Sequence, residues 1–563
     1  MSDLEIFEEL KLLYGNKAGE VSREVQKVVA KYDGGLPAYS SRLTEKDAVV
    51  ITYADTIRRR GEPPLRTLKL FFDEQLSGLV NTIHILPFYP YTSDDGFAVT
   101  DYFSVHPEFG TWDHIRSLSE KYHLMFDAVI NHMSKSSVWF QEFLAGNPDY
   151  ADFFIRVDGK DKRLAKVFRP RTLPLVHKYP SSSGELVGVW TTFSEDQVDL
   201  NFANGKVFVV ILDLLLFYIS KGARLIRLDA VGFLWKRLGT TCIHLPETHL
   251  VIRLYRKIIE RMTKGVLFIT ETNVPHKDNI SYFGNGHNEA HLVYNFTLPP
   301  LLAFSVVTSN VEKLGKWLSG LKLPSSGEAC YFNFTASHDG VGLQPVKDIL
   351  TPEEREVLVY QAKANGGFIS YKNNPDGSRS PYELNCTYLD LLSQPGDPVS
   401  LKARKFILTQ AFMLTLPGLP GIYIHSLLGT ENDQEGVAKS GIYRRINRAK
   451  LEYNALLSAL KEEGTLRHRV FANYKKILAA RKNSSWFDPF LPFTSEVLEN
   501  KIVVIKKTRG EKQFLGVFNF SPEEFSFSPS GHSPGLNVVT SRPEAVFPIV
   551  LPPYGFRWIE TLV

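Results

Sequence analysis

The sequence predicts an α/β fold in which eight parallel strands, with helices between them, close into a (β/α)8 TIM barrel. Short apolar, β-rich runs recur along the chain, and each is followed by enough residues for a helix. Nearly continuous apolar strands that alternate with helices are typical of a parallel sheet, and eight such units favour a closed barrel over an open sheet. The candidate strands are Val49–Tyr53, Ile83–Phe88, Leu124–Val129, Arg224–Ala230, Val266–Glu271, Leu292–Phe296, Tyr331–Ser337 and Gly421–Ile424.

Two long segments interrupt the barrel pattern. The residues from Met133 to Asn204 follow the third strand and are rich in proline, glycine, serine and basic residues, which indicates an inserted excursion domain. A second insertion, Ala364–Leu392, contains the turn sequence NNPDG at 373–377. Long irregular loops at the carboxyl-terminal face of a barrel are usually functional, so we expect both insertions to lie over the site.

The two ends of the chain have patterns of their own. Residues 1–46 are amphipathic and predict helices that pack on the barrel. After about residue 473, the runs Ile502–Ile505, Phe514–Phe518 and Arg557–Ile559 predict a C-terminal antiparallel β domain. The expected organisation is a helical segment at 1–46, a catalytic barrel at 47–132 and 205–472, an inserted domain B at 133–204 and a β domain at 473–563.

The composition indicates a globular protein and excludes several classes of partner. The 563 residues are 44% hydrophobic and 22% charged, and the net charge is only +4. The basic residues are spread along the chain rather than clustered, so we expect no nucleic acid partner. The longest apolar run, Val207–Ile219, is interrupted by Asp213 and is too short to cross a bilayer; we interpret it as a buried barrel helix.

The cysteines and the N-terminus indicate a cytoplasmic protein. Cys242, Cys330 and Cys386 are odd in number, far apart and without metal-ligand spacing. Free thiols in a reducing cytoplasm are the simplest interpretation, with neither a disulfide framework nor a metal site. The acidic start of the sequence, followed by a helical pattern, is not a signal peptide.

The segment ARLIRLDA at 223–230 is the strongest indication of chemistry. Residues two apart in a strand point to the same side, so Arg227 and Asp229 emerge together where this strand ends. The carboxyl ends of barrel strands are where (β/α)8 enzymes place their active sites. An arginine beside an aspartate favours the ionised carboxylate, which is the form that can act as a nucleophile.

Polar side chains follow three other strands in the same way. The third strand continues into Asp127 and His132, the fifth ends at Glu271, and His338 and Asp339 follow the seventh. A single aspartate at a strand end is more often a helix N-cap, and a single histidine is more often structural. If each of these residues were only structural, their presence at four matching strand ends of one barrel would require four independent coincidences. We therefore interpret them as one site.

These segments resemble the four signature regions of the α-amylase family. Within it, the chain is similar to the sucrose-phosphorylase-like branch, whose markers here are LPFYP at 86–90, DDGF at 94–97 and GIYRRINR at 441–448. The resemblance extends from about Val49 into the C-terminal β domain. It implies that Asp229 is the nucleophile, Glu271 the general acid/base, Asp339 the stabilising third carboxylate, and Arg227 the group that orients the nucleophile.

The resemblance also implies a glucose pocket. Its substrate-binding residues would be the hydroxyl-binding His132 and His338, the Asp94–Arg448 pair that closes the pocket, the aromatic platform Phe97, and Tyr382 and Arg379 in the second insertion. Read from the sequence alone, Asp94 would be a turn residue and Phe97 a core residue.

The chemistry of glycosidic bonds explains why two carboxyl groups need different protonation states. One must be protonated to release the leaving oxygen, and the other must be ionised to attack. Glu271 ends an apolar run, so burial and the nearby Asp229 should raise its pKa. We expect the two carboxyl groups to lie about 5–5.5 Å apart, the spacing of a retaining mechanism.

The fold cannot decide whether water, a sugar or phosphate attacks the glucosyl intermediate. Phosphate requires cationic groups on the acceptor side, and the candidates are Arg169, Arg171, Lys372 and Arg379. The loops WTTFS at 190–194, TETNVPHKDN at 270–279 and NNPDGSRSPYE at 373–383 resemble those of glucosylglycerate phosphorylases. This resemblance implies phosphorolysis of glucosylglycerate, with phosphate as co-substrate and no cofactor; Arg379 would bind glycerate or phosphate.

Three alternatives remain open at this point. The chain could be a sucrose, sucrose 6′-phosphate or glucosylglycerol phosphorylase, with the same mechanism and a different acceptor. The chain could be a transglucosylase or hydrolase of the same family. It could also be a non-catalytic carbohydrate-binding protein, although such a protein would not need Asp229, Glu271 and Asp339 together. The sequence does not indicate the oligomeric state.

Overall fold

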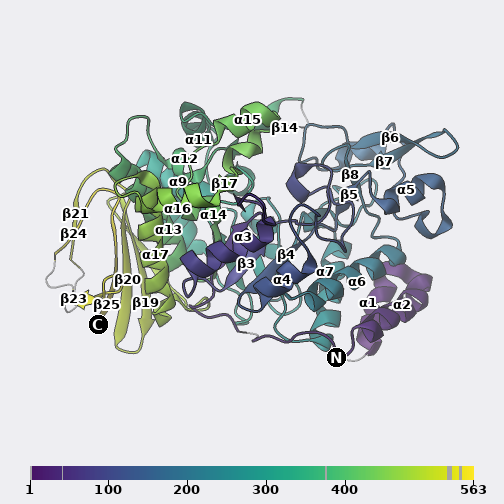
Figure 1. Ribbon diagram of the computed structural model, residues 1–563, viewed down its shortest axis with the longest axis horizontal. Coiled ribbons are helices and arrows are strands. Elements are labelled where there is room, and N and C mark those ends of the chain that lie inside the picture. The colour runs from purple at the N-terminus through teal and green to yellow at the C-terminus, as the bar shows by residue number, and fades with distance from the viewer. Residues whose placement is uncertain (1–2, 41, 375–376, 529–534, 544–547, 563) are drawn as a thin grey trace.

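A computed structural model of the protein describes residues 3–40, 42–374, 377–528, 535–543 and 548–562. Its centre is a closed barrel of eight parallel strands, each paired with its neighbours in chain order (Figure 1). The strands are β1 (Val49–Thr52), β3 (Thr82–Ile85), β4 (His123–Ala128), β9 (Ala223–Leu228), β10 (Leu267–Thr270), β11 (Leu292–Tyr294), β12 (Cys330–Phe334) and β16 (Leu419–Tyr423).

All eight predicted barrel strands are confirmed, with ends that differ by a few residues. The barrel strands form readily because their residues are apolar or β-branched and both faces of the sheet are covered. Every residue of β9 is buried, for example. In the register between β4 and β9, Asp127 lies opposite Arg227. The two polar side chains are therefore brought together inside the barrel.

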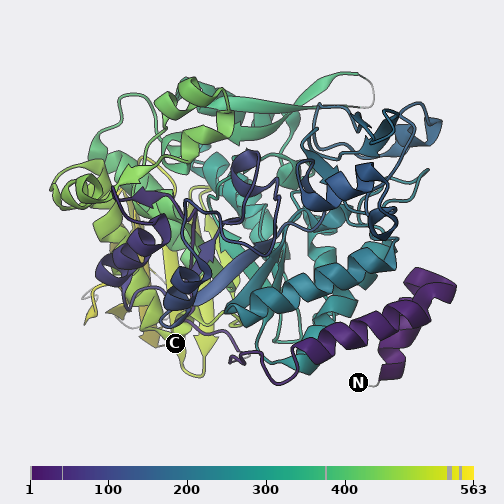
Figure 2. The same cartoon turned by 45° about the vertical axis from the view of Figure 1, so that its right-hand side comes forward.

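Helices surround the barrel and cover its outer face (Figure 2). The apolar run around Val207–Ile219 forms one of them, as expected. The longer helices outside the inserted domain are α3 (Pro64–Phe71), α4 (Trp112–Ser119), α6 (Gly205–Ser220), α7 (Pro246–Met262), α9 (Leu298–Thr308), α10 (Glu312–Gly320), α11 (Pro352–Ala364), α13 (Val399–Thr415), α16 (Tyr453–Lys461) and α17 (Leu466–Lys482). Shorter helices are α8 (His276–Asn279), α12 (Tyr388–Leu392), α14 (Ile424–Leu427) and α15 (Gln434–Ser440).

The N-terminal segment forms two helices, α1 (Asp3–Tyr14) and α2 (Ala18–Lys31), which lie against α6 and α7 (Figure 2). The Tyr14 ring meets the edge of Phe208 on α6 at 6.1 Å between centroids, and Tyr14 Oη donates to the Phe202 carbonyl at 3.2 Å. Lys31 Nζ forms an ion pair with Asp213 at 2.8 Å. The two helices thus extend the barrel core rather than forming a separate unit.

The inserted domain B lies between β5 (His132–Ser134) and β8 (Gln197–Asp199), which pair with each other. It contains α5 (Val138–Ala145) and the hairpin of β6 (Val176–Pro180) and β7 (Leu186–Trp190). Lys236, which follows β9, joins this domain to the barrel, because its Nζ lies 2.7 Å from Asp199 Oδ2 and 2.7 Å from Asn131 Oδ1. All three side chains are buried, so the base of domain B is held firmly.

The second insertion forms a hairpin of β14 (Phe368–Asn373) and β15 (Arg379–Asn385), and β13 (Val341–Gly342) pairs with β15. We call β14 and β15 the acceptor hairpin, because two of the cations considered for the acceptor side, Lys372 and Arg379, belong to it. Its inner end lines the pocket described below. A further two-stranded pair, β2 (Ile57–Arg58) with β17 (Leu451–Glu452), lies beside the barrel.

The C-terminal β domain lies at the other end of the long axis from domain B (Figure 1). Its strands are β18 (Thr494–Leu498), β19 (Ile502–Arg509), β20 (Lys512–Asn519), β21 (Phe525–Phe527), β22 (Leu536–Asn537), β23 (Arg542–Pro543), β24 (Ile549–Leu551) and β25 (Phe556–Leu562). The expected boundary near residue 473 needs correction, because it falls inside α17. The buried residues Leu466, Val470, Tyr474 and Ile477 recur at helical spacing, so the helical pattern continues past residue 473.

Among the described residues, no helix is long and apolar enough to cross a membrane. Cys242, Cys330 and Cys386 are buried free thiols. In the same part of the chain, no cluster of three or more His, Cys, Asp or Glu side chains is arranged to hold a metal ion.

Replacement of Phe208 by alanine tests whether the N-terminal helices share the barrel core. Phe208 is fully buried, stacks on Tyr255 at 4.5 Å and contacts Tyr14. Phe208→Ala should lower the free energy of unfolding by about 3–5 kcal/mol, the usual cost of a phenylalanine-sized cavity. Leu12→Ala is the control, since Leu12 is 76% exposed, and it should change stability little. Equal stability of the two variants in chemical denaturation would contradict the shared core.

Candidate active site

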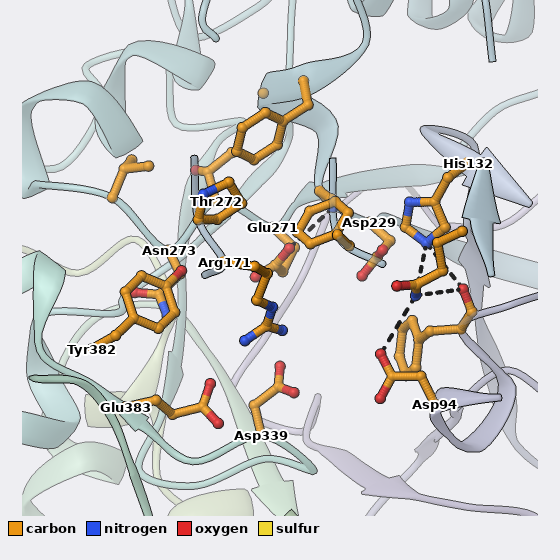
Figure 3. Close-up of a pocket in the computed structure, with 18 of the residues that line it drawn as sticks. Asp94, His132, Arg171, Asp229, Glu271, Thr272, Asn273, Asp339, Tyr382 and Glu383 are labelled. Carbon is orange, nitrogen blue, oxygen red and sulfur yellow. Dashed lines mark hydrogen bonds between the residues drawn. The ribbon is translucent and has the colours of Figure 1, made fainter. Parts of the chain in front are cut away.

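A pocket of about 760 Å³ opens at the carboxyl-terminal face of the barrel. Figure 3 shows the side chains of Asp229, Glu271 and Asp339 pointing into it. The lining also includes residues from domain B and from the acceptor hairpin. The structure therefore places the three carboxylates selected from the sequence in one cavity, as we expected from four polar strand ends.

Each carboxylate follows the end of a barrel strand. Asp229 comes directly after β9, Glu271 directly after β10, and Asp339 five residues after the end of β12. Ala230 adopts a left-handed backbone conformation, with φ of 47°. Its amide donates to Glu271 Oε2 at 3.0 Å, so the turn that follows the first carboxylate also orients the second.

Arg227 is the cation shared by the buried acids. Its Nη1 donates to Asp229 Oδ1 at 2.7 Å and also to Asp127 Oδ1, while Nη2 lies 3.9 Å from Glu271 Oε2. Arg227 is almost completely buried, so these contacts are not weakened by water. Asp127 is fully buried as well, and its other oxygen, Oδ2, lies 2.6 Å from His84 Nε2.

Burial raises the pKa of Glu271 to about 7; Arg227 opposes this change, while Asp229 and Asp339 add to it. The direction agrees with the sequence-based expectation. A carboxyl group with this pKa exchanges its proton near neutral pH, as a general acid and base must. The expected separation of about 5–5.5 Å between the Asp229 and Glu271 carboxyls stays a prediction.

Burial also raises the pKa of Asp229, and Arg227 offsets part of this rise. The sequence predicted that Arg227 lowers the pKa of Asp229, but it did not show that burial raises this pKa by more. The third carboxylate behaves differently. Burial raises the pKa of Asp339, but Arg444, Arg448 and other arginines lower it by more, so this pKa lies below its ordinary value.

Arg444 makes the closest contact with Asp339, at 2.6 Å from Nη1 to Oδ1. The same guanidinium binds Glu383 of the acceptor hairpin through Nε at 2.9 Å and Nη2 at 2.7 Å. Arg444 was not among the residues selected from the sequence, although it lies in the GIYRRINR marker. Its position depends on η9 (Tyr443–Asn447), a short 3₁₀-helix whose orientation has no clear sequence signal.

The Asp94–Arg448 pair is present only as a long contact, 3.9 Å from Nη1 to Asp94 Oδ1. The closer partner of Arg448 is Asp95, at 2.7 Å, and Arg445 also binds Asp95 at 2.5 Å. The expected pair is thus joined by a closer one with the neighbouring buried aspartate, and the role of Asp94 and Arg448 at a glucose pocket stays a prediction. Asp94 lines the pocket, whereas Asp95 points away from it toward the two arginines.

Aromatic and histidine side chains form the floor of the pocket. Phe97 stacks on His338, with ring centroids 4.8 Å apart and an interplanar angle of 4°. His132 Nε2 lies 2.9 Å from the Phe97 carbonyl oxygen and 3.3 Å from Gln197 Nε2. Gln197 belongs to domain B and was not selected from the sequence. It also reaches Asp94 Oδ2 at 3.5 Å and so links the floor to the rim.

Of the four cations considered for the acceptor side, only Arg171 lines the pocket. Its guanidinium points toward the Asp339 carboxyl in Figure 3. Arg169 donates instead to the carbonyl of Leu173, and Lys372 Nζ donates to Gln344 Oε1 at 2.9 Å.

Arg379 requires a correction, because it is exposed at the start of β15 and does not line the pocket. Tyr382 and Glu383 of the same strand do line it. A strand advances about 3.3 Å per residue, so Arg379 lies about 10 Å further out along β15 than Tyr382. The sequence identified the hairpin but could not show which of its residues reach inward.

The remaining lining is aromatic and amide-bearing. Phe168, Phe193 and Phe233 form one wall, with Phe193 and Phe233 5.5 Å apart in an edge arrangement. Asn273, two residues after Glu271, faces the acceptor hairpin (Figure 3). The motifs WTTFS and TETNV contain Phe193 and Asn273, but nothing in either motif marks these residues individually.

An eight-stranded barrel with three carboxylates in one pocket, one of them bonded to a buried arginine, is typical of an enzyme that acts on glycosidic bonds. The alpha-amylase catalytic domain family matches residues 76–338, and the chain belongs to this family. It is 50% identical over 489 residues to the glucosylglycerate phosphorylase of Spirochaeta thermophila, covering 85% of this chain and 82% of the relative. The protein of the same name from Allomeiothermus silvanus is 44% identical over 561 residues, covering 98% of each.

Among solved structures, sucrose 6F-phosphate phosphorylase from Thermoanaerobacter thermosaccharolyticum has a TM-score of 0.74 at 24% identity. The match covers 85% of this chain and 95% of that one. At this identity the likeness establishes the fold alone.

The stabilities of alanine variants at Asp94 and Asp95 should show that Asp95 is the structural partner of Arg448 and that Asp94 is a pocket residue. Asp95→Ala leaves Arg448 buried without its closest partner and should lower the free energy of unfolding by about 3–5 kcal/mol. Asp94→Ala should cost about 1 kcal/mol or less, because its side chain is 31% exposed and its contact with Arg448 is long. Both residues have φ near +50°, so backbone strain is matched. A larger loss for Asp94→Ala in denaturant titration would refute the assignment.

Proposed function

We propose that this chain is a retaining glycoside phosphorylase that transfers the α-glucosyl group of glucosylglycerate to phosphate. The products are α-D-glucose 1-phosphate and glycerate. The single observation that supports this most is the meeting of Asp229, Glu271 and Asp339 in one pocket, with the pKa of Glu271 at about 7. The relatives named above, 44–50% identical over most of the chain, support the choice of donor and acceptor.

In the first step, an oxygen of the Asp229 carboxylate attacks the anomeric carbon. The bond from that carbon to the glycerate oxygen breaks, and Glu271 gives its proton to the departing oxygen. The result is a β-linked glucosyl–Asp229 ester and free glycerate. Arg227 holds Asp229 at 2.7 Å and so limits the directions in which the nucleophile can point.

In the second step, an oxygen of phosphate attacks the same carbon from the face that glycerate left. Glu271, now a carboxylate, takes the phosphate proton, and the bond to Asp229 breaks. Two inversions at one carbon give net retention. Asp339 keeps its negative charge because Arg444 lies 2.6 Å away, so it can stabilise the positive charge that develops on the sugar in both steps.

The glucosyl group would be held by side chains on the floor and rim of the pocket. Hydroxyl groups would bind His132, His338 and Asp94, and the apolar face of the sugar would lie on Phe97. Arg448 takes part through Asp95 and the His338 carbonyl, to which its Nε donates at 2.8 Å. Tyr382 would contact the leaving group from the acceptor hairpin.

Arg171 is our candidate for binding the anion on the acceptor side. Glycerate and phosphate are both small anions, and a guanidinium binds either through paired hydrogen bonds. Arg444 is less suited to this role, since Asp339 and Glu383 already neutralise it. Arg379 would act here only in a conformation that brings the start of β15 inward.

No cofactor or metal enters the proposed reaction, because proton transfer and covalent attack need only side chains and phosphate. The proposed partners are therefore a sugar substrate and phosphate. We propose a cytoplasmic location, which is supported by three cysteines that are all unpaired.

A panel of donors with phosphate tests the proposed function. The purified protein should form α-glucose 1-phosphate from glucosylglycerate at a kcat/KM at least about 10-fold above that for the uncharged donors sucrose and glucosylglycerol, since an anionic acceptor matches Arg171. The comparison donors are sucrose, sucrose 6′-phosphate and glucosylglycerol, and the Asp229→Asn variant is the blank. Preferential use of another donor would reassign the acceptor, and glucose release independent of phosphate would indicate a hydrolase.

The pH dependence of the first step tests the role of Glu271. Because burial raises its pKa to about 7, the protonated form that can donate is abundant below pH 7 and is lost above it. The kcat/KM for glucosylglycerate should therefore fall about tenfold per pH unit above pH 7. Glu271→Gln has no proton to give, so its kcat/KM should be low and independent of pH in this range. An unchanged alkaline limb in this variant would assign the acid to another residue.

A further inference from the structure

A histidine lies beneath the pocket at the start of a chain of contacts that ends at Asp229. His84 is on β3, Asp127 on β4 and Arg227 on β9, which are three neighbouring barrel strands. In the register, His84 pairs with Met125, and Asp127 follows two residues later, so both side chains point into the barrel. Asp127 in turn lies opposite Arg227.

The contacts along this chain are short and fully buried. His84 Nε2 lies 2.6 Å from Asp127 Oδ2, and both side chains are completely excluded from solvent. Arg227 Nη1 donates both to Asp127 Oδ1 and to Asp229 Oδ1. One nitrogen therefore serves two carboxylates, and any movement of Asp127 changes where that nitrogen can be relative to Asp229.

Asp127 depends on His84 for its second oxygen. A buried carboxylate with an unpaired oxygen is costly, because no water is present to replace the lost hydrogen bond. Without the histidine, Asp127 would turn both oxygens toward Arg227 or take up a proton. Either response changes the strength and geometry of the hydrogen bond that Arg227 donates to Asp229.

The hydrogen-bond pattern also assigns the proton on the imidazole. Burial raises the pKa of Asp127, but Arg227 and His84 lower it by more, so Asp127 is a carboxylate and accepts from His84 Nε2. His84 Nδ1 is buried and has no partner among the described residues.

We propose that His84 is a positioning residue for the nucleophile, acting on Asp229 through Asp127 and Arg227. It does not line the pocket, so it touches neither sugar nor phosphate. Its loss should slow formation of the glucosyl–Asp229 ester without weakening substrate binding. The inference rests on the proposed role of Asp229 as nucleophile.

The test uses α-glucosyl fluoride, whose fluoride ion leaves without help from the acceptor side. Attack by Asp229 forms the ester bond, the carbon–fluorine bond breaks, and fluoride is measured with phosphate present to complete the cycle. His84→Leu should lower kcat by about 10- to 100-fold, the size of effect expected when a reacting group is misplaced by about 1 Å. KM for the fluoride donor should change by less than threefold. His84→Gln, whose amide can still donate to Asp127, should recover kcat to within about threefold of the wild type.

Two further variants distinguish positioning from a general loss of structure. His425→Gln is the matched control, because His425 is also buried and its ring nitrogen Nδ1 bonds to the hydroxyl of Thr430 rather than to a carboxylate. It should keep the wild-type kcat. In Asp127→Asn, the carboxylate on which His84 acts is gone, so adding His84→Leu should change kcat by less than twofold.

Each outcome has a defined meaning. Wild-type kcat in folded His84→Leu overturns the inference, as does equal loss in His84→Leu and His84→Gln. If His84→Leu does not fold, His84→Asn replaces it, since its shorter amide does not reach Asp127, and a wild-type kcat there overturns the inference equally. Absence of fluoride release from the wild type would instead refute the proposed function itself.

Discussion

The site depends on one buried guanidinium, that of Arg227. It lies between Asp127 and Asp229 and within 3.9 Å of Glu271, so it is the positive charge nearest to three buried acids. In a region without water, each of these charges interacts strongly with the others. Burial raises the pKa of both Glu271 and Asp229, and this cation offsets part of each rise. The strand register that sets Asp127 opposite Arg227 is therefore as important to the chemistry as the carboxylates themselves.

The parts of the structure that could be predicted from the sequence are those governed by strand periodicity. Eight apolar runs and the polar residues at their ends specify the barrel and the convergence of Asp229, Glu271 and Asp339, because parallel strands end at a common edge. The parts that could not be predicted depend on irregular backbone. Arg444, which was not selected from the sequence, makes the closest contact with Asp339 because of a short 3₁₀-helix. Of the cations considered for the acceptor side, Arg171 lines the pocket and Arg379 does not, because β15 points outward at its start.

The division between barrel and loops also explains why the fold alone leaves the acceptor open. The carboxylates and Arg227 come from barrel strands, and the same arrangement serves hydrolases, transferases and phosphorylases of the family. Domain B contributes Arg171, Phe193 and Gln197, and the acceptor hairpin contributes Tyr382 and Glu383. The buried Lys236 ties the base of domain B to the barrel, so the loop residues face the carboxylates from a rigid support.

The bond between Arg444 and Glu383 has a consequence for the design of new acceptor preferences. One guanidinium pairs with both Asp339 and an almost fully buried glutamate of the acceptor hairpin. A transplanted hairpin that lacks Glu383 would leave Arg444 with a single anion and would alter the charge felt by the sugar as well as by the acceptor. When loops are grafted between relatives, this arginine and this glutamate must therefore be exchanged together.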